Sequence, residues 1–307
     1  MSEELKQKIV SRVVKDLQRI EVELAENLHP HLELVSEIAR HILFSGGKRL
    51  RPLLMVLSAR LCGYQNDSTH KFATIFEYLH AATLLHDDLV DGAAMRRGRP
   101  VAHAVWDPAT VVLVGDFLLA RSLTIASETG RSQILRVIAE ITENMSQGEI
   151  QQLMHRVSVR LTEEDYLEVI RRKTAVLFQG ACRVSGILAD VSEPKQQALA
   201  DYGRNLGLAF QMADDLLDYT VNSSKLGKLV GADLREGKLT LPVIVALKQS
   251  TGSDRWQMVE IIRNQDFSAE EFKWLIGRLQ KYGGIEHTKK RAWEHIETAK
   301  QALASFE

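Results

Sequence analysis

The chain has 307 residues, 45% hydrophobic and 26% charged, a composition that predicts a soluble globular protein. Its formal net charge of −1 gives no indication of a nucleic acid or an anionic membrane as partner. The sequence contains no uninterrupted run of ~18 apolar residues, so we expect no transmembrane helix. The polar N-terminus does not resemble a secretory signal. Cys62 and Cys182 lack a metal-ligand spacing. We therefore expect a cytoplasmic protein with no nucleic-acid partner and no stable membrane anchor.

Apolar residues recur at helical spacing along the chain. The expected helices cover residues 4–28, 32–43, a stretch that Pro52 opens, 69–90, 108–127, 132–155, 162–188, 192–219 and a stretch that Pro242 opens, followed by two or three shorter ones. Thr162-Glu163-Glu164-Asp165 is typical of a helix cap, and residues 222–239 are expected to form a loop. No alternating strand pattern and no linker are found. The sequence therefore predicts one all-α domain, residues 1–307, built as a helical bundle.

Two aspartate clusters, DDLVD and DDLLD, each follow an apolar stretch. Their carboxylates are Asp87, Asp88 and Asp91 in the first cluster and Asp214, Asp215 and Asp218 in the second. Residues four apart on a helix project from the same face, one turn apart. Carboxylates that are clustered and partly removed from water need cations or become protonated. One such cluster could be a solvated helix end, but two equivalent clusters favour Mg²⁺ shared with substrate phosphates.

Basic residues occur both before and after each cluster in the sequence. They are found in Gly46-Gly47-Lys48-Arg49-Leu50-Arg51-Pro52, in Arg96-Arg97-Gly98, in Lys173-Thr174 and at Lys228. Each could be an ordinary surface charge. Lysine and arginine also form charge-assisted hydrogen bonds with phosphate oxygens, and glycine-rich turns before helices suit phosphate. The combination indicates an anionic ligand bridged by metal rather than a bare Ca²⁺ site.

These motifs, GGKRLRP, DDLVD with Arg96-Arg97-Gly98, and GLAFQMADDLLD, follow one another in an order that resembles the trans-isoprenyl diphosphate synthases, or polyprenyl synthetases. The resemblance covers nearly the whole chain and points to the long-chain type, to which octaprenyl diphosphate synthases belong. It implies an all-α bundle around a deep central cavity and a homodimer. It also implies successive head-to-tail condensation of isopentenyl diphosphate onto an allylic diphosphate, with three Mg²⁺ ions bound alongside the allylic diphosphate.

The resemblance also implies roles for individual residues. The metal ligands would be Asp87, Asp88, Asp91, Asp214, Asp215 and Asp218, and the catalytic set would be Asp87, Asp88, Asp91, Lys173, Asp214 and Asp215. Isopentenyl diphosphate would bind Lys48, Arg51, His80 and Arg97. The allylic diphosphate would bind Arg96, Lys173, Thr174, Gln211 and Lys228. Loss of the allylic diphosphate would leave a cation, which the double bond of isopentenyl diphosphate attacks.

The residues that precede Asp87 on its helix bear on product length. One helical turn of ~5.4 Å is comparable to one extended isoprene unit. The expected tunnel therefore runs along Thr83, Ala82, Leu79 and Phe76, away from the aspartates. Short-chain members of the family carry a bulky aromatic residue at the first of these levels. Ala82 and Thr83 are small, so the resemblance implies a long product, about C30–C50, used for a quinone side chain or a carrier lipid.

Four alternatives stay open at this point. The product could be shorter, of the farnesyl or geranylgeranyl class. A class I terpene cyclase shares the metal chemistry, although its second motif is normally of an Asn/Ser/Glu type. A non-catalytic subunit of a heteromeric prenyl synthase typically lacks one or both aspartate clusters. A helical Ca²⁺-binding scaffold would not explain the basic residues.

Overall fold

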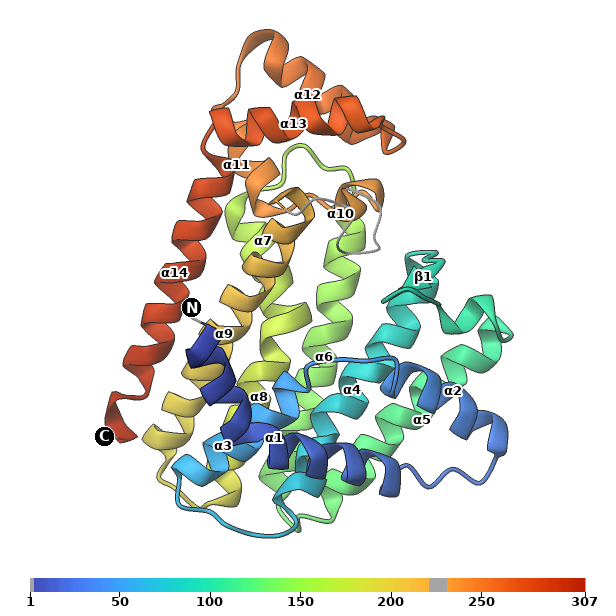
Figure 1. Cartoon of the computed structure of the whole chain (residues 1–307), viewed down its shortest axis with the longest axis vertical. Coiled ribbons are helices and arrows are strands. Elements are labelled where there is room, and N and C mark those ends of the chain that lie inside the picture. The colour runs from blue at the N-terminus through green and yellow to red at the C-terminus, as the bar shows by residue number, and fades with distance from the viewer. Residues whose placement is uncertain (1–2, 221–230, 307) are drawn as a thin grey trace. The chain divides into compact units, whose positions relative to one another are not determined.

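The computed structural model describes residues 3–220 and 231–306 (Figure 1). Its helices are α1 (Glu3–Glu26), α2 (Glu33–Leu43), α3 (Leu50–Leu61), α4 (Thr69–Val90), α5 (Pro108–Ser127), α6 (Ser132–Met154), α7 (Glu163–Ile170), α8 (Val176–Leu188), α9 (Glu193–Thr220), α10 (Ala232–Arg235), α11 (Leu241–Gln249), α12 (Gly252–Asn264), α13 (Ala269–Lys281) and α14 (Gly284–Ala302). Short 3₁₀ turns cover η1 (Ala102–Ala104) and η4 (Ala304–Phe306), and η2 (Arg171–Ala175) is a π-helical turn. The all-α prediction is confirmed for the described residues.

Two local features differ from the sequence prediction. A two-stranded antiparallel hairpin pairs β1 (Met95–Arg96) with β2 (Arg99–Pro100). Arg97 and Gly98 form its turn with φ values of 51° and 76°, as a type I′ turn requires. Strands of two residues are too short to produce an alternating pattern. The expected loop at 222–239 also includes the short helix α10, within the part that the structure describes.

The described residues divide into two compact units. The first comprises residues up to Thr142, the segment Gly180–Ala200 and the chain end from Ser305. The second comprises Glu143–Gln179 and Asp201–Ala304. DDLVD therefore belongs to the first unit and DDLLD to the second. The expectation of a single domain stays a prediction.

Helix α4 forms the centre of the first unit. It packs against α1, α2, α3 and α5, and Figure 1 shows α4 and α5 side by side. Phe76, Tyr78 and Leu79 are buried, and the Tyr78 hydroxyl donates to the carbonyl of Leu24 on α1 at 2.8 Å. A helix with packing partners on several sides needs apolar residues around most of its circumference. This burial explains the apolar stretch that precedes DDLVD.

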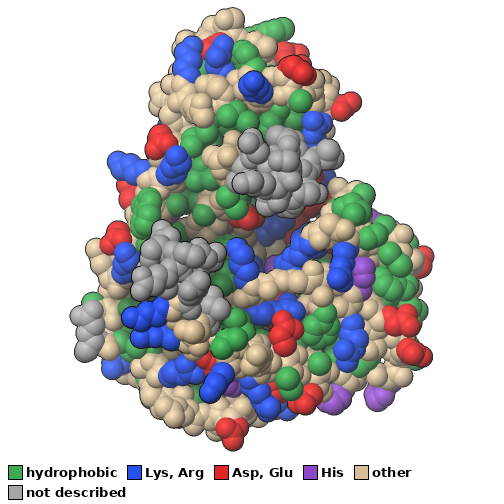
Figure 2. Space-filling view, in the orientation of Figure 1, with side chains coloured by type: hydrophobic (Ala, Val, Ile, Leu, Met, Phe, Trp, Pro, Cys, Tyr) green, Lys and Arg blue, Asp and Glu red, His purple; other side chains and the backbone are tan. Residues whose placement is uncertain are grey.

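Helix α5 is, among the described residues, long and apolar enough to cross a membrane by length and composition. Asp116 and Arg121 interrupt its apolar residues, and one side of the helix packs along α4. The core helix of a soluble bundle has the same composition. On the face that Figure 2 shows, basic and acidic side chains are interspersed with apolar ones, consistent with the net charge of −1.

The second unit has its own apolar core, contributed by α7, η2, α9 and the helices from α10 to α14. The rings of Tyr219, Phe272 and Phe267 stack in this core, with neighbouring centroids 6.0 and 5.5 Å apart. Helix α7 begins with the expected cap. The Thr162 side chain accepts from the Asp165 N–H, and the Asp165 carboxylate accepts from the Thr162 N–H, both at 3.1 Å. The capping prediction is confirmed.

The start of α14 lies against α11 with no room for a side chain. A Cβ atom at Gly284 would lie 2.1 Å from the carbonyl oxygen of Pro242. Gly284→Ala must therefore displace backbone, and we expect it to lower the free energy of unfolding by about 1–3 kcal/mol. Gly277→Ala on α13 is the control, since no atom beyond its chain neighbours and its own helix backbone lies within 4 Å of its Cβ position; it should raise stability by roughly 0.5–1 kcal/mol. Urea denaturation measures both, and equal effects would contradict this packing.

Candidate active site

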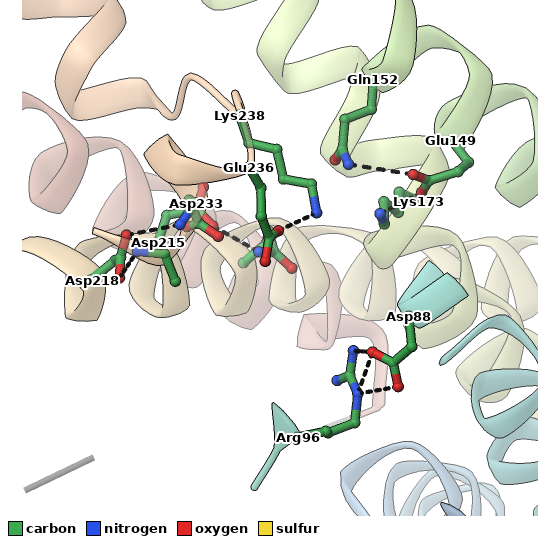
Figure 3. Close-up of polar contacts among 12 residues, drawn as sticks. Asp88, Arg96, Glu149, Gln152, Lys173, Asp215, Asp218, Asp233, Glu236 and Lys238 are labelled. Carbon is green, nitrogen blue, oxygen red and sulfur yellow. Dashed lines mark hydrogen bonds and ion pairs between the residues drawn. The ribbon is translucent and has the colours of Figure 1, made fainter. Parts of the chain in front are cut away.

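The first aspartate cluster lies at the end of α4. Asp87 and Asp88 belong to its last turn, and Asp91 is the first residue beyond it. Asp88 is buried and accepts three hydrogen bonds from Arg96 of β1 (Figure 3). Arg96 Nε lies 2.9 Å from each carboxylate oxygen and Nη2 lies 2.6 Å from Oδ1. Arg96, expected at the allylic diphosphate, therefore also holds Asp88, while Asp87 and Asp91 are half-buried.

The hairpin that follows the cluster brings Arg97 to the glycine turn of the first unit. Arg97 Nη1 donates to the carbonyl of Gly46. Burial, followed by the charges of Arg51, Arg96 and Arg97, holds the pKa of His80 well below its usual range. Its imidazole is therefore neutral near pH 7. Burial also lowers the pKa of Arg51 to about 10, although Glu77 opposes this effect. The structure thus brings together three of the four residues expected at isopentenyl diphosphate; Lys48 is exposed on the same turn.

The second cluster lies in the last two turns of α9. Asp215 is buried and accepts hydrogen bonds from the Tyr166 hydroxyl at 2.6 Å and from Gln211 Nε2 at 2.7 Å. Burial raises the pKa of Asp215 to about 6, against the effect of these two bonds and with the help of the neighbouring aspartates. Asp218 accepts from the backbone N–H groups of Ala232 and Asp233 at 3.1 and 3.2 Å (Figure 3). Asp214 is exposed.

Lys173 and Thr174 lie in the π-helical turn η2. Turns of this kind occur often at functional sites because they redirect side chains. Lys173 forms an ion pair with Glu149 of α6. Thr174 Oγ1 donates to Gln211 Oε1 at 2.9 Å, and Gln211 in turn donates to Asp215. One hydrogen-bonded chain therefore joins η2 to the second cluster. Lys228 lies outside the described residues.

Five residues that the sequence analysis missed take part in these contacts or act on a residue that does. They are Glu149, Tyr166, Asp233, Glu236 and Lys238. Burial, followed by the charges of Asp215 and Asp218, raises the pKa of Asp233 well above its usual range. Lys238 pairs with Glu236 at 2.7 Å (Figure 3). No periodic pattern marks Tyr166, because it lies 49 residues from Asp215, which it contacts.

The donor set fits Mg²⁺ in part. In the part of the chain that the structure describes, no three His, Cys, Asp or Glu side chains are arranged to hold a metal by themselves. Mg²⁺ usually keeps several waters and binds one or two carboxylates together with substrate phosphates. Burial, followed by the charges of neighbouring carboxylates, raises the pKa values of Asp215 and Asp233 and so disfavours their ionised forms. A cation would stabilise their ionised form.

Comparison with known proteins agrees with this arrangement. The polyprenyl synthetase family model matches residues 32–279. The chain is 38% identical to octaprenyl diphosphate synthase of Escherichia coli (strain K12), over 97% of this chain and 92% of that protein. It is 37% identical to all-trans-nonaprenyl-diphosphate synthase (geranyl-diphosphate specific) of Rhodobacter capsulatus, over 99% and 93%.

A solved structure shares the fold over nearly its full length. Polyprenyl synthase from Caulobacter crescentus, complexed with calcium and isoprenyl diphosphate, superposes with a TM-score of 0.91 at 38% identity, over 98% of this chain and 92% of that one. Helical architecture, aspartate clusters and sequence identity therefore lead to the same conclusion. The chain belongs to the polyprenyl synthetase family and is a prenyltransferase of isoprenoid biosynthesis that acts on isoprenyl diphosphates.

Proposed function

We propose that this prenyltransferase adds isopentenyl diphosphate repeatedly, head to tail, to an allylic diphosphate and releases an all-trans polyprenyl diphosphate of about C30–C50. The observation that carries the proposal is the charge arrangement of the first unit. An acidic cluster ends α4, and a separate group of cations, Arg51 and Arg97 beside His80, adjoins it. A condensing enzyme must bind two diphosphates, whereas a terpene cyclase needs one. The names of the octaprenyl and nonaprenyl relatives support the long product.

In the proposed reaction the carbon–oxygen bond of the allylic diphosphate breaks, and its electron pair leaves with the diphosphate. The double bond of isopentenyl diphosphate forms the new carbon–carbon bond with the allylic cation, and a proton then passes to the released diphosphate. Bound Mg²⁺ would neutralise charge on the leaving group. Lys173 and Arg96 would contribute charge-assisted hydrogen bonds to the same group.

The roles expected from the resemblance are proposed unchanged. Asp87, Asp88, Asp91, Asp214, Asp215 and Asp218 would serve three Mg²⁺ ions; Lys48, Arg51, His80 and Arg97 would bind isopentenyl diphosphate; Arg96, Lys173, Thr174, Gln211 and Lys228 would bind the allylic diphosphate. Because Asp88 and Asp215 are buried and hydrogen-bonded to neighbours, their half-buried or exposed neighbours Asp87, Asp91 and Asp214 are the better candidates for direct metal contact. A neutral His80 can donate one hydrogen bond to a phosphate oxygen.

We further propose a cytoplasmic homodimer, with both units acting as one catalytic domain, and a product destined for a quinone side chain. Leu34 of α2, Val105 after η1 and Leu113 of α5 are exposed on elements that pack against one another. An apolar surface of this kind supports self-association.

Product analysis tests the proposed function directly. The purified chain is incubated with labelled isopentenyl diphosphate, Mg²⁺ and geranyl, farnesyl or geranylgeranyl diphosphate, and the extracted prenyl alcohols are sized by chromatography. We expect products of about C30–C50, and none in EDTA. Products of the farnesyl or geranylgeranyl class would favour the short-chain alternative. No incorporation with any primer would favour a non-catalytic subunit.

Product length should depend on the buried face of α4 that precedes Asp87. Ala82, Leu79 and Phe76 are buried there, and Thr83 is half-buried. Ala82→Phe should shorten the product by several isoprene units, because a ring would close the tunnel about one turn below Asp87. Leu79→Phe, about one turn deeper, should shorten it less. Chromatographic sizing at matched isopentenyl incorporation measures both, and an unchanged distribution in both variants would contradict this placement of the tunnel.

The hydrogen bond from Tyr166 should matter for metal binding at the second cluster. Tyr166→Phe removes a donor from the buried Asp215 carboxylate. We expect the affinity for Mg²⁺ in the presence of inorganic diphosphate to fall about tenfold or more, and kcat to fall by a similar factor. Thermal-shift titration measures the affinity. Tyr282→Phe is the matched control, since it removes a similar bond, at 2.7 Å, to Asp254, which belongs to neither aspartate cluster. Equal behaviour of the two variants would rule out this role for Tyr166.

A further inference from the structure

Arg49 lies between two residues expected at isopentenyl diphosphate, Lys48 and Arg51, yet its side chain forms hydrogen bonds with other parts of the protein. It is buried, with 5% of its surface exposed. Nε donates to Glu21 Oε1 at 2.7 Å, and Nη1 donates to Glu77 Oε1 at 2.7 Å. Nη2 donates to the carbonyl of Leu43 at 2.5 Å and to Glu21 Oε2 at 3.3 Å. All three nitrogens of the guanidinium are therefore occupied by protein acceptors.

These acceptors come from three different helices. Glu21 belongs to α1, Leu43 is the last residue of α2, and Glu77 belongs to α4. Arg49 itself precedes α3 with φ of 48°, a left-handed backbone conformation that is unfavourable for residues other than glycine. Such conformations persist where the surroundings fix them, and they gather at functional sites. The guanidinium contacts thus fix the position at which α3 and its first-turn residue Arg51 begin.

The glycine turn connects Arg49 with a second arginine. A Cβ atom at Gly47 would lie 3.3 Å from Arg49 Nη1 and 3.4 Å from Arg97 Nη1. Both guanidiniums therefore pack closely against Gly47, and Arg97 also donates to the carbonyl of Gly46. The contacts of Arg49 thereby determine the position of the Gly46 carbonyl, which accepts a hydrogen bond from Arg97.

Glu77 acts on three arginines of the first unit. It binds Arg49 directly, and its charge also acts on Arg51 and Arg97. Glu77 precedes His80 by three residues on α4, a spacing that brings the two to the same face. One carboxylate thus anchors the turn and offsets part of the repulsion among neighbouring guanidiniums.

We infer that Arg49 is a positioning residue: it does not contact substrate, but its contacts with Glu21, Glu77 and Leu43 hold the turn so that Lys48, Arg51 and Arg97 converge on isopentenyl diphosphate. The inference rests on the proposed function, which assigns those cations to that substrate. Lysine cannot replace Arg49, because an ammonium is a point charge, whereas the planar guanidinium donates in several fixed directions at once.

Steady-state kinetics of Arg49→Lys tests this role. We expect KM for isopentenyl diphosphate to rise at least about tenfold, because small misplacements of binding groups are costly. KM for the allylic diphosphate should stay within about twofold, since the hydrogen bonds of Arg49 go to Glu21, Glu77 and Leu43, and kcat within about threefold. Parallel losses in kcat and both KM values would overturn the inference, because they indicate a general structural defect.

Arg60→Lys is the matched control. Arg60 of α3 donates Nη2 to both oxygens of Asp16 on α1, at 2.9 and 3.0 Å, so this variant also disturbs an ion pair between α1 and α3. It should leave both KM values unchanged. If Arg49→Lys does not fold, Glu21→Gln weakens only one of the two acidic partners and should raise KM for isopentenyl diphosphate by a smaller factor. No selective rise in either Arg49→Lys or Glu21→Gln would overturn the inference.

Arg51→Gln separates failure of the inference from failure of the proposed function. Arg51 is itself assigned to isopentenyl diphosphate, so its loss should raise that KM whether or not Arg49 has a positioning role. An unchanged KM in Arg51→Gln contradicts the proposed assignment of the site, and with it the inference. A raised KM in Arg51→Gln with an unchanged KM in Arg49→Lys contradicts the inference alone.

Discussion

Repulsion between like charges is the constraint on which the rest of the structure depends. In the first unit, Arg49, Arg51, Arg96 and Arg97 all act on His80, and they stay together because acidic side chains bind two of them. Glu21 and Glu77 bind Arg49, and Asp88 binds Arg96. Buried ion pairs of this kind cost desolvation free energy and repay it only with good geometry. In the proposed function, Arg51 and Arg97 would supply the positive charge for a substrate diphosphate.

The second unit has the opposite imbalance. Asp215 and Asp233 have raised pKa values because burial and neighbouring carboxylates disfavour their ionised forms. Hydrogen bonds from Tyr166 and Gln211 stabilise Asp215 only in part. A site of this kind gains most from an added cation, whereas the cationic group of the first unit gains most from an anion. The proposed chemistry would supply both ions. Metal bound with the allylic diphosphate would be the cation, and the second diphosphate, bound by arginine, would be the anion.

Much of this could be predicted from the sequence, because helical periodicity and caps are local signals. Helix α4 has the predicted bounds, and Thr162 and Asp165 form the predicted cap. The aspartate clusters were found because four-residue spacing on a helix is visible in a sequence.

Contacts between distant segments were not accessible in this way. The two acidic partners of Arg49 are 28 residues away on either side, and Tyr166 lies 49 residues from Asp215. The π-helical turn at Lys173 and the turn at Arg97 also depend on packing and backbone conformation that no periodic pattern records. The sequence therefore identified which residues carry charge, but not which of those charges bind each other.

Calorimetric titration with each substrate separately is the most direct test of the central claim that one diphosphate is bound by arginine and the other through metal. The account predicts that isopentenyl diphosphate binds in EDTA and that Arg51→Gln abolishes this binding. It predicts that the allylic diphosphate binds measurably only when Mg²⁺ is added. An allylic diphosphate that binds equally well in EDTA, or isopentenyl diphosphate that requires Mg²⁺, would contradict the account.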